Sequence, residues 1–151
     1  MDNIIKGVLD FRQNVYPARK DLFGSLAGGQ DPDILFITCS DSRIDPNLLT
    51  GSDPGDLFIC RNAGNIIPPH SNETGGMTAS IEYAVAVLGV RHIIVCGHTD
   101  CGAIKGAMDL GALKGLPHVK EWLGHCRSAM EIVRERNGIE SGACLAPEHL
   151  N

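Results

Sequence analysis

The distribution of apolar and polar positions along the chain predicts strands that alternate with helices. Apolar runs typical of buried strands lie near residues 33–38, 56–60 and 92–96, and an apolar stripe at helical spacing covers residues 75–88. Gly89 follows this stripe, at a place where glycine commonly ends a helix in the left-handed conformation. Strands that alternate with helices indicate βαβ units, so the fold class is α/β, with a mostly parallel central sheet flanked by helices.

The flanking segments extend this prediction. Residues 2–27 contain two stretches with helical spacing, which predict an N-terminal helical arm, and a short helical turn is expected at 46–49. Residues 117–136 predict a long helix that begins with a proline in its first turn. The first and third strands contain few polar residues, so we expect both to be covered on two faces. We expect a single domain over residues 1–151.

Composition and charge exclude several classes of function. The formal net charge is −5, and the absence of a Lys/Arg cluster argues against a nucleic acid or an anionic membrane surface as the partner. No segment approaches the roughly 20 apolar residues of a membrane helix, and the N-terminus lacks the pattern of a secretory signal. The 6 cysteines are interpreted as reduced thiols. We expect a cytoplasmic protein, or one of an organelle stroma if a targeting peptide has been removed.

Potential metal ligands follow two of the predicted strands. Cys39 ends the first strand and begins the motif Cys-Ser-Asp-Ser-Arg, whereas His98 and Cys101 follow the third strand within His-Thr-Asp-Cys. Ligands of open α/β sheets bind outside the carboxyl ends of the strands, so these three side chains are expected to meet. Two cysteines and one histidine form a known ligand set of catalytic zinc, which leaves the fourth position open. The sequence therefore predicts a Zn²⁺ site.

Three acidic residues near these motifs have open alternatives. Asp41 either closes the site as a fourth zinc ligand or pairs with Arg43, whose guanidinium can hold a carboxylate through two hydrogen bonds. Asp45 and Asp100 are either hydrogen-bond acceptors behind the ligands or, as we favour, a helix cap and a solvated turn.

At these residues the chain resembles the β-class carbonic anhydrases, from about Phe11 to about Met108. Five blocks match in the family's order: Cys39-Ser-Asp-Ser-Arg43, Gly55-Asp-Leu-Phe58, Arg61-Asn-Ala-Gly-Asn65, Ile81-Glu-Tyr-Ala-Val85 and Gly97-His-Thr-Asp-Cys-Gly-Ala103. The resemblance implies a β-carbonic-anhydrase-like fold and a zinc lyase. Its reaction would be the reversible hydration of CO2 to bicarbonate and a proton by zinc-bound hydroxide.

The resemblance also implies roles for individual residues. Asp41 and Arg43 would form a catalytic dyad beside the zinc ligands. Gln30 and the Gly102 backbone N–H would contact substrate or bicarbonate, and Phe58 and Tyr83 would be pocket walls from a partner subunit, which implies a homodimer or higher homo-oligomer. The surroundings of Gln30 and the Pro68-Pro69 pair are more similar to the plant-type branch, in which zinc stays open.

One departure from the family keeps two alternative functions open. Family members usually continue for several tens of residues beyond the helix that is expected to end near Arg136, and they add a further strand there. The chain is therefore expected to be shortened at its C-terminus and to lack that strand region. The alternatives are a carbonyl sulfide or carbon disulfide hydrolase on the same scaffold, and a non-catalytic zinc-binding fragment.

Overall fold

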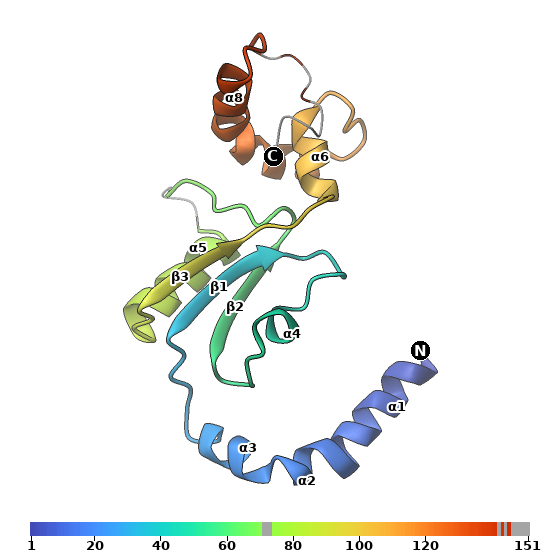
Figure 1. The fold of residues 1–151 in the computed structure, drawn as a ribbon, viewed down its shortest axis with the longest axis vertical. Coiled ribbons are helices and arrows are strands. Elements are labelled where there is room, and N and C mark those ends of the chain that lie inside the picture. The colour runs from blue at the N-terminus through green and yellow to red at the C-terminus, as the bar shows by residue number, and fades with distance from the viewer. Residues whose placement is uncertain (71–73, 142, 144, 146–151) are drawn as a thin grey trace. The chain divides into compact units, whose positions relative to one another are not determined.

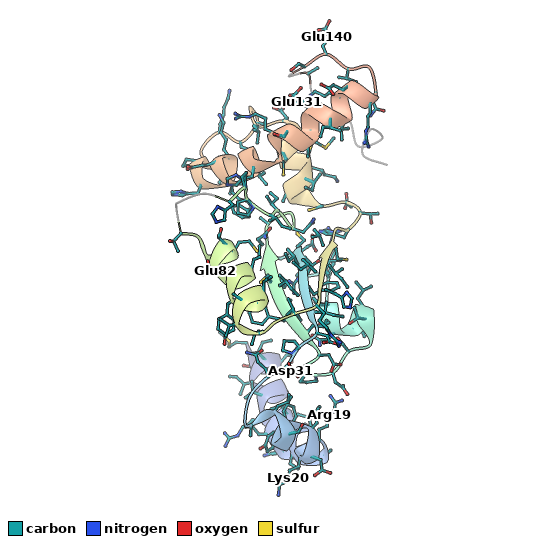
Figure 2. All side chains as sticks on the ribbon, turned by 90° about the vertical axis from the view of Figure 1, so that its left-hand side faces the viewer. Arg19, Lys20, Asp31, Glu82, Glu131 and Glu140 are labelled. Carbon is teal, nitrogen blue, oxygen red and sulfur yellow. The ribbon has the colours of Figure 1, made fainter. Side chains whose placement is uncertain are left out.

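The structure is a computed structural model that describes residues 1–70, 74–141, 143 and 145. It divides into two compact units, Met1–Asp31 and Pro32–Asn151, and the expectation of one domain stays a prediction. All elements of the first unit are helical (Figure 1): α1 (Asp2–Asp10), a π-helical turn (Phe11–Val15), α2 (Tyr16–Ala18) and α3 (Lys20–Leu26). Arg19 and Lys20 lie where α2 gives way to α3 (Figure 2).

Aromatic contacts hold the helices of the first unit together. The ring of Phe23 stacks on Tyr16 at 5.2 Å and meets the edge of Phe11 at 5.7 Å. No residue of this unit is buried, and apolar residues of α1 such as Ile4 and Val8 are more than half exposed, at 69% and 56%. The predicted N-terminal helical arm is confirmed, and the helices of this unit leave the apolar residues of α1 exposed.

The second unit is built on a parallel sheet with the strand order β2-β1-β3 (Figure 1). The strands are β1 (Ile34–Cys39), β2 (Leu57–Asn62) and β3 (His92–Cys96), close to the predicted ranges. The central strand is fully buried at Leu35, Ile37 and Thr38. In the register of the sheet, Thr38 lies opposite Cys96 of β3 and Arg61 of β2, so all three strands end at the same edge.

One helical segment crosses from β2 to β3 and covers a face of the sheet. It comprises α5 (Gly76–Glu82) and a π-helical continuation (Tyr83–Val87), and it ends at Gly89, which has φ +67° as expected. The buried residue Ala84 packs with Leu35, Ile37 and Cys60. This packing orders the sheet whose ends carry the predicted ligands.

The expectation that β3 is covered on both faces is wrong. Ile93, Ile94 and Val95 are 52%, 40% and 50% exposed. Within the described residues β3 is an edge strand that pairs only with β1, so its outer side has no neighbour there. An apolar run predicts that the side chains of a strand are buried, but it does not predict whether they are buried by the same chain or by another one.

The helices that follow β3 form a second core. The short α4 (Pro46–Thr50) matches the predicted turn, and α6 (Gly102–Met108) packs against the later helices around Met108, Leu123 and Met130. The predicted helix 117–136 is instead α7 (Pro117–Leu123) and α8 (Arg127–Arg136). A 3-10 turn beginning at Gly124 separates them, because glycine weakens the helix there. None of the helices in the described part of the chain is long and apolar enough to cross a membrane.

Candidate metal centre

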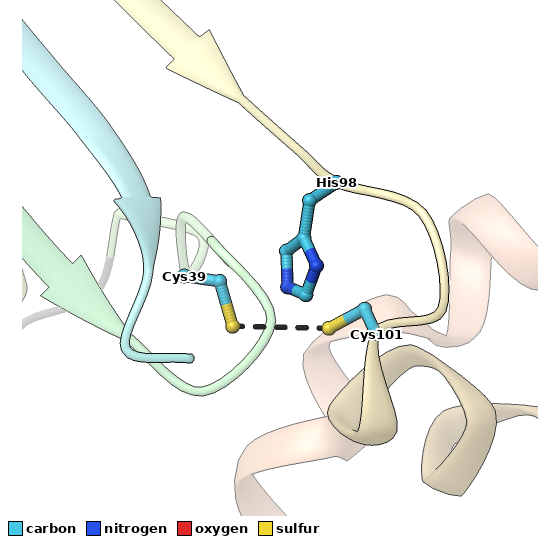
Figure 3. A group of neighbouring side chains, drawn as sticks. All are labelled: Cys39, His98 and Cys101. Atoms are coloured by element: carbon cyan, nitrogen blue, oxygen red, sulfur yellow. Dashed lines mark hydrogen bonds between the residues drawn. The ribbon is translucent and has the colours of Figure 1, made fainter. Parts of the chain in front are cut away.

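Three potential ligands converge at the carboxyl edge of the sheet (Figure 3). Cys39 is the last residue of β1, His98 lies in the loop after β3, and Cys101 caps the start of α6. Their ligand atoms all lie within 4.8 Å of one another, and the two sulfur atoms are 3.8 Å apart. The structure thus brings together the three residues that the sequence predicted as zinc ligands.

The geometry of these side chains fits zinc. Two thiolates bound at the usual Zn–S length of about 2.3 Å in a tetrahedron are about 3.8 Å apart, and the observed separation of 3.8 Å agrees. The imidazole is also prepared for a metal. Its Nδ1 lies 2.9 Å from the Thr99 carbonyl oxygen, which can only accept, so Nδ1 carries the proton. The lone pair is therefore on Nε2, which is buried and has no hydrogen-bond partner among the described residues.

The surroundings of the two thiols favour the thiolate at Cys39 more than at Cys101. Burial raises the pKa of Cys39, but hydrogen bonding to its sulfur, first of all from the Gly64 backbone N–H, outweighs burial and lowers the pKa to about 7. Burial raises the pKa of Cys101, and the neighbouring Cys39 adds to that effect. Because the thiolate is the form that binds a metal ion, Cys39 is deprotonated for metal binding more readily than Cys101.

Asp41 lies beside the ligands but is held by Arg43. Arg43 donates from Nε to Oδ1 of Asp41 at 2.9 Å and from Nη2 to Oδ2 at 2.8 Å. These hydrogen bonds lower the pKa of the Asp41 carboxyl well below its ordinary range. Its Oδ2 is nevertheless only 3.9 Å from Nε2 of His98. Of the two alternatives for Asp41, the structure contains the paired form, in which the carboxylate belongs to Arg43.

Arg61 is a contributor that the sequence reasoning missed. From the end of β2 its guanidinium donates to the backbone carbonyls of Cys39, Asp41 and Ile44, at 2.9, 2.8 and 2.9 Å. It therefore ties down the loop that carries a zinc ligand and the paired carboxylate. The available signal was an arginine at the end of an otherwise apolar strand, within the block Arg61-Asn-Ala-Gly-Asn65.

The two remaining acidic residues differ in role. Asp45 caps α4 by accepting from the Leu48 backbone N–H at 3.0 Å, as the favoured interpretation had it. Asp100 lies in an exposed turn, as that interpretation had it, but its carboxylate also accepts from Arg43 and from Lys105. The hydrogen bond from Lys105 lowers the pKa of the Asp100 carboxyl most, and the hydrogen bond from Arg43 lowers it further. Arg43 and Asp100 are 57 positions apart in the sequence, so local sequence patterns could not predict their hydrogen bond.

Phe58 and Tyr83, two of the residues expected to contact substrate, do not lie beside this chain's own ligands. Phe58 and Tyr83 meet at a ring distance of 5.9 Å, but Phe58 lies opposite Leu35, four residues before Cys39. Four residues of strand span about 13 Å. Gly102 is the exposed first residue of α6, and Gln30 belongs to the N-terminal unit. Their substrate roles stay predictions.

Two thiols and an imidazole nitrogen that has no partner among the described residues lie at the carboxyl edge of a parallel sheet. This arrangement is that of an α/β protein with a zinc site. Sequence comparison identifies the family within this class. The family model described as "Carbonic anhydrase" matches residues 34–148. The chain belongs to the carbonic anhydrase family, and its structural neighbours place it in the β class.

Individual relatives agree with this assignment. The chain is 52% identical over 143 residues to a carbonic anhydrase of Synechococcus elongatus, which covers 93% of this chain and 53% of the relative. The solved β-carbonic anhydrase CcaA superposes with a TM-score of 0.87 at 48% identity, over 93% of this chain and 69% of that one. A tetrameric β-carbonic anhydrase of Sordaria macrospora gives a TM-score of 0.65 at 39% identity, over 91% and 62%. The chain spans about half the length of the curated relatives it matches.

Proposed function

We propose that this protein catalyses the reversible hydration of CO2 to bicarbonate and a proton, with zinc held by Cys39, His98 and Cys101. The observation that carries the proposal is the buried Nε2 of His98, which has no hydrogen-bond partner in the part of the chain that the structure describes and lies within 4.8 Å of both sulfur atoms. Membership of the carbonic anhydrase family supports the reaction. The relatives matched carry the same name and do not favour the sulfide-releasing or non-catalytic alternatives.

The residues of this chain would divide the work as follows. When bound, zinc lowers the pKa of a coordinated water toward neutral pH and so supplies a nucleophile, a role for which carbonic anhydrase is the reference example. Asp41, ionised and oriented by Arg43, offers a carboxylate oxygen that accepts a hydrogen bond beside the ligands and aligns the attacking group. The Gly102 backbone N–H, at the start of α6, is available to the developing anion of bicarbonate.

The substrate pocket would be shared between two copies of the chain. Phe58 lies about 13 Å along the sheet from Cys39 and Tyr83 packs against Phe58, so as pocket walls they would serve the site of a partner. The exposed apolar residues of α1 and of β3 offer surface for such an assembly. The Sordaria macrospora relative is described as tetrameric. A homodimer or higher homo-oligomer is therefore part of the proposal.

Two finer assignments belong to the same proposal. The hydrogen-bonded pair of Asp41 and Arg43 supports the plant-type branch, in which the carboxylate stays off the metal and Gln30 contacts the substrate. A cytoplasmic location rests on the sequence alone.

Stopped-flow CO2 hydration on this chain tests the proposal, with zinc content and native mass measured on the same sample. We expect turnover, about one zinc per chain and a mass of two or more chains, and Cys101→Ser is the matched control without metal. Bound zinc in a monomer without turnover would identify the non-catalytic fragment. Release of sulfide from carbonyl sulfide without CO2 hydration would identify the hydrolase instead.

A further inference from the structure

Arg43 has a second acidic partner besides Asp41. Its Nη1 donates to Oδ2 of Asp100 at 3.3 Å, and its Nη2 donates to the Asp100 backbone carbonyl at 3.1 Å. The opposite oxygen of the same carboxylate, Oδ1, accepts from Lys105. The guanidinium is thus held between two carboxylates, one beside the zinc ligands and one on the loop that carries two of them.

The backbone at Asp100 is specialised for this contact. Asp100 has φ +57°, a left-handed conformation that is uncommon outside glycine and is tolerated best by asparagine and aspartate. Asp100 lies between His98 and Cys101, so the turn that points its carboxylate and its carbonyl at Arg43 is the turn that places both ligands.

The alternative position for Asp41 is close at hand. Its Oδ2 is 3.9 Å from Nε2 of His98, so the carboxylate already lies beside the nitrogen that would bind zinc. Three hydrogen bonds from Arg43 hold the Asp41 carboxylate off this nitrogen, one from the backbone N–H and two from the guanidinium. The two guanidinium bonds depend on what fixes the Arg43 side chain, because that side chain is 57% exposed.

We propose that Asp100, anchored by Lys105, is a positioning residue that fixes the guanidinium of Arg43 and thereby keeps Asp41 from occupying the fourth zinc position. This inference rests on the proposed zinc site and deepens it, because it assigns the open state of that site to a contact made on the ligand loop itself. Arg43 would hydrogen-bond to the carboxylates of both Asp41 and Asp100, and Asp100 would affect the zinc site only through Arg43.

The test uses azide, a small anion that binds open metal positions, titrated calorimetrically into zinc-loaded protein. Asp100→Gly removes the carboxylate and accepts the left-handed backbone, whereas Asp100→Asn keeps an acceptor oxygen at the same place. We expect azide affinity to fall about 2- to 5-fold in Asp100→Gly, in the range of one exposed charged contact, and to recover in part in Asp100→Asn. Loss of a negative charge by itself would tighten anion binding, so the expected sign is opposite to that of simple electrostatics.

Two further proteins make the result specific. In the Asp41→Ala background, Asp100→Gly is expected to leave azide affinity unchanged, since no carboxylate remains to turn toward the metal. Asp33→Asn removes a similarly exposed ion pair, with Arg91, at the opposite end of β1, and is expected to have no effect. Unchanged or tighter azide binding in Asp100→Gly, an equal loss in the Asp41→Ala background, or loss of zinc itself would overturn the proposal. A protein that binds zinc and azide as expected but does not hydrate CO2 would refute the proposed function and leave this inference intact.

Discussion

Removal of the Arg61 guanidinium is expected to weaken both the fold and the zinc site. Arg61 makes three hydrogen bonds to the carbonyls of the loop from Cys39 to Ile44. A charged donor contributes about 1.5–3 kcal/mol per hydrogen bond, but the side chain is exposed and water replaces part of each bond, so values nearer the neutral figure of about 0.5–1 kcal/mol apply. For Arg61→Met, which keeps most of the apolar stem, the expected loss is about 2 kcal/mol.

This loss translates into two measurable changes. The melting temperature of the zinc-loaded protein should fall by about 4–8 °C, from the usual 2–4 °C per kcal/mol for a chain of this size. Zinc affinity, measured by competition with a chelator, should fall by up to about 30-fold, because about 1.4 kcal/mol corresponds to a factor of ten and zinc must then order the loop itself. Arg61→Lys, whose ammonium lacks the planar fork, should lie between Arg61→Met and the unchanged protein.

The control is Arg91→Met, which removes an exposed arginine that pairs with Asp33 at the start of β1. It should cost at most about 1 kcal/mol and leave zinc affinity unchanged. If Arg61→Met retained both the melting temperature and the zinc affinity, the idea that this guanidinium holds the ligand loop would be refuted.

Three other predictions concern the site and the strands beneath it. Cys101→Ser should lower zinc content sharply, measured by mass spectrometry of the metal, because a serine hydroxyl does not replace a thiolate; a full zinc complement would remove Cys101 from the ligand set. Arg43→Ala should keep zinc but lose CO2 hydration. In the zinc-free protein, Arg43→Ala should also shift acid unfolding, followed by circular dichroism, to higher pH. The reason is that the lowered pKa of Asp41 stabilises the folded protein above the unfolded carboxyl's pKa of about 3.9, and this stability is lost as pH falls through the pKa of Asp41 in the folded protein. Thr38→Val removes a fully buried hydroxyl that donates to the Cys96 carbonyl at 2.9 Å, and should cost about 1 kcal/mol in thermal unfolding, with Thr38→Ser as the variant that keeps the hydrogen bond.

The ligand set could be predicted from the sequence because it depends on local patterns. Apolar runs locate β1 and β3, and parallel strands bring their carboxyl ends to one edge, so Cys39, His98 and Cys101 had to approach one another. The pairing of Asp41 with Arg43 is also local, since the two residues are two positions apart.

The contacts that orient these residues could not be predicted in the same way. Arg61 reaches the Cys39 carbonyl across 22 positions of sequence, and Arg43 reaches Asp100 across 57. Such contacts depend on strand register and on the positive φ of Asp100, and the spacing of apolar residues in the sequence predicts neither of them. The exposed β3 was predicted wrongly for a related reason: its apolar composition reports a need for burial but not the identity of its neighbour.

The sequence by itself determined the parallel α/β scaffold and the three ligands at its carboxyl edge, because hydrophobic period and strand-end position are properties of short segments. Only the tertiary structure decided that Nε2 of His98 is left without a partner among the described residues, that Asp41 is held by Arg43, and that Arg61 and Asp100 hold the surrounding loops. The physical reason is that directional hydrogen bonds between distant residues form only after strand register has set their donors and acceptors within about 3 Å.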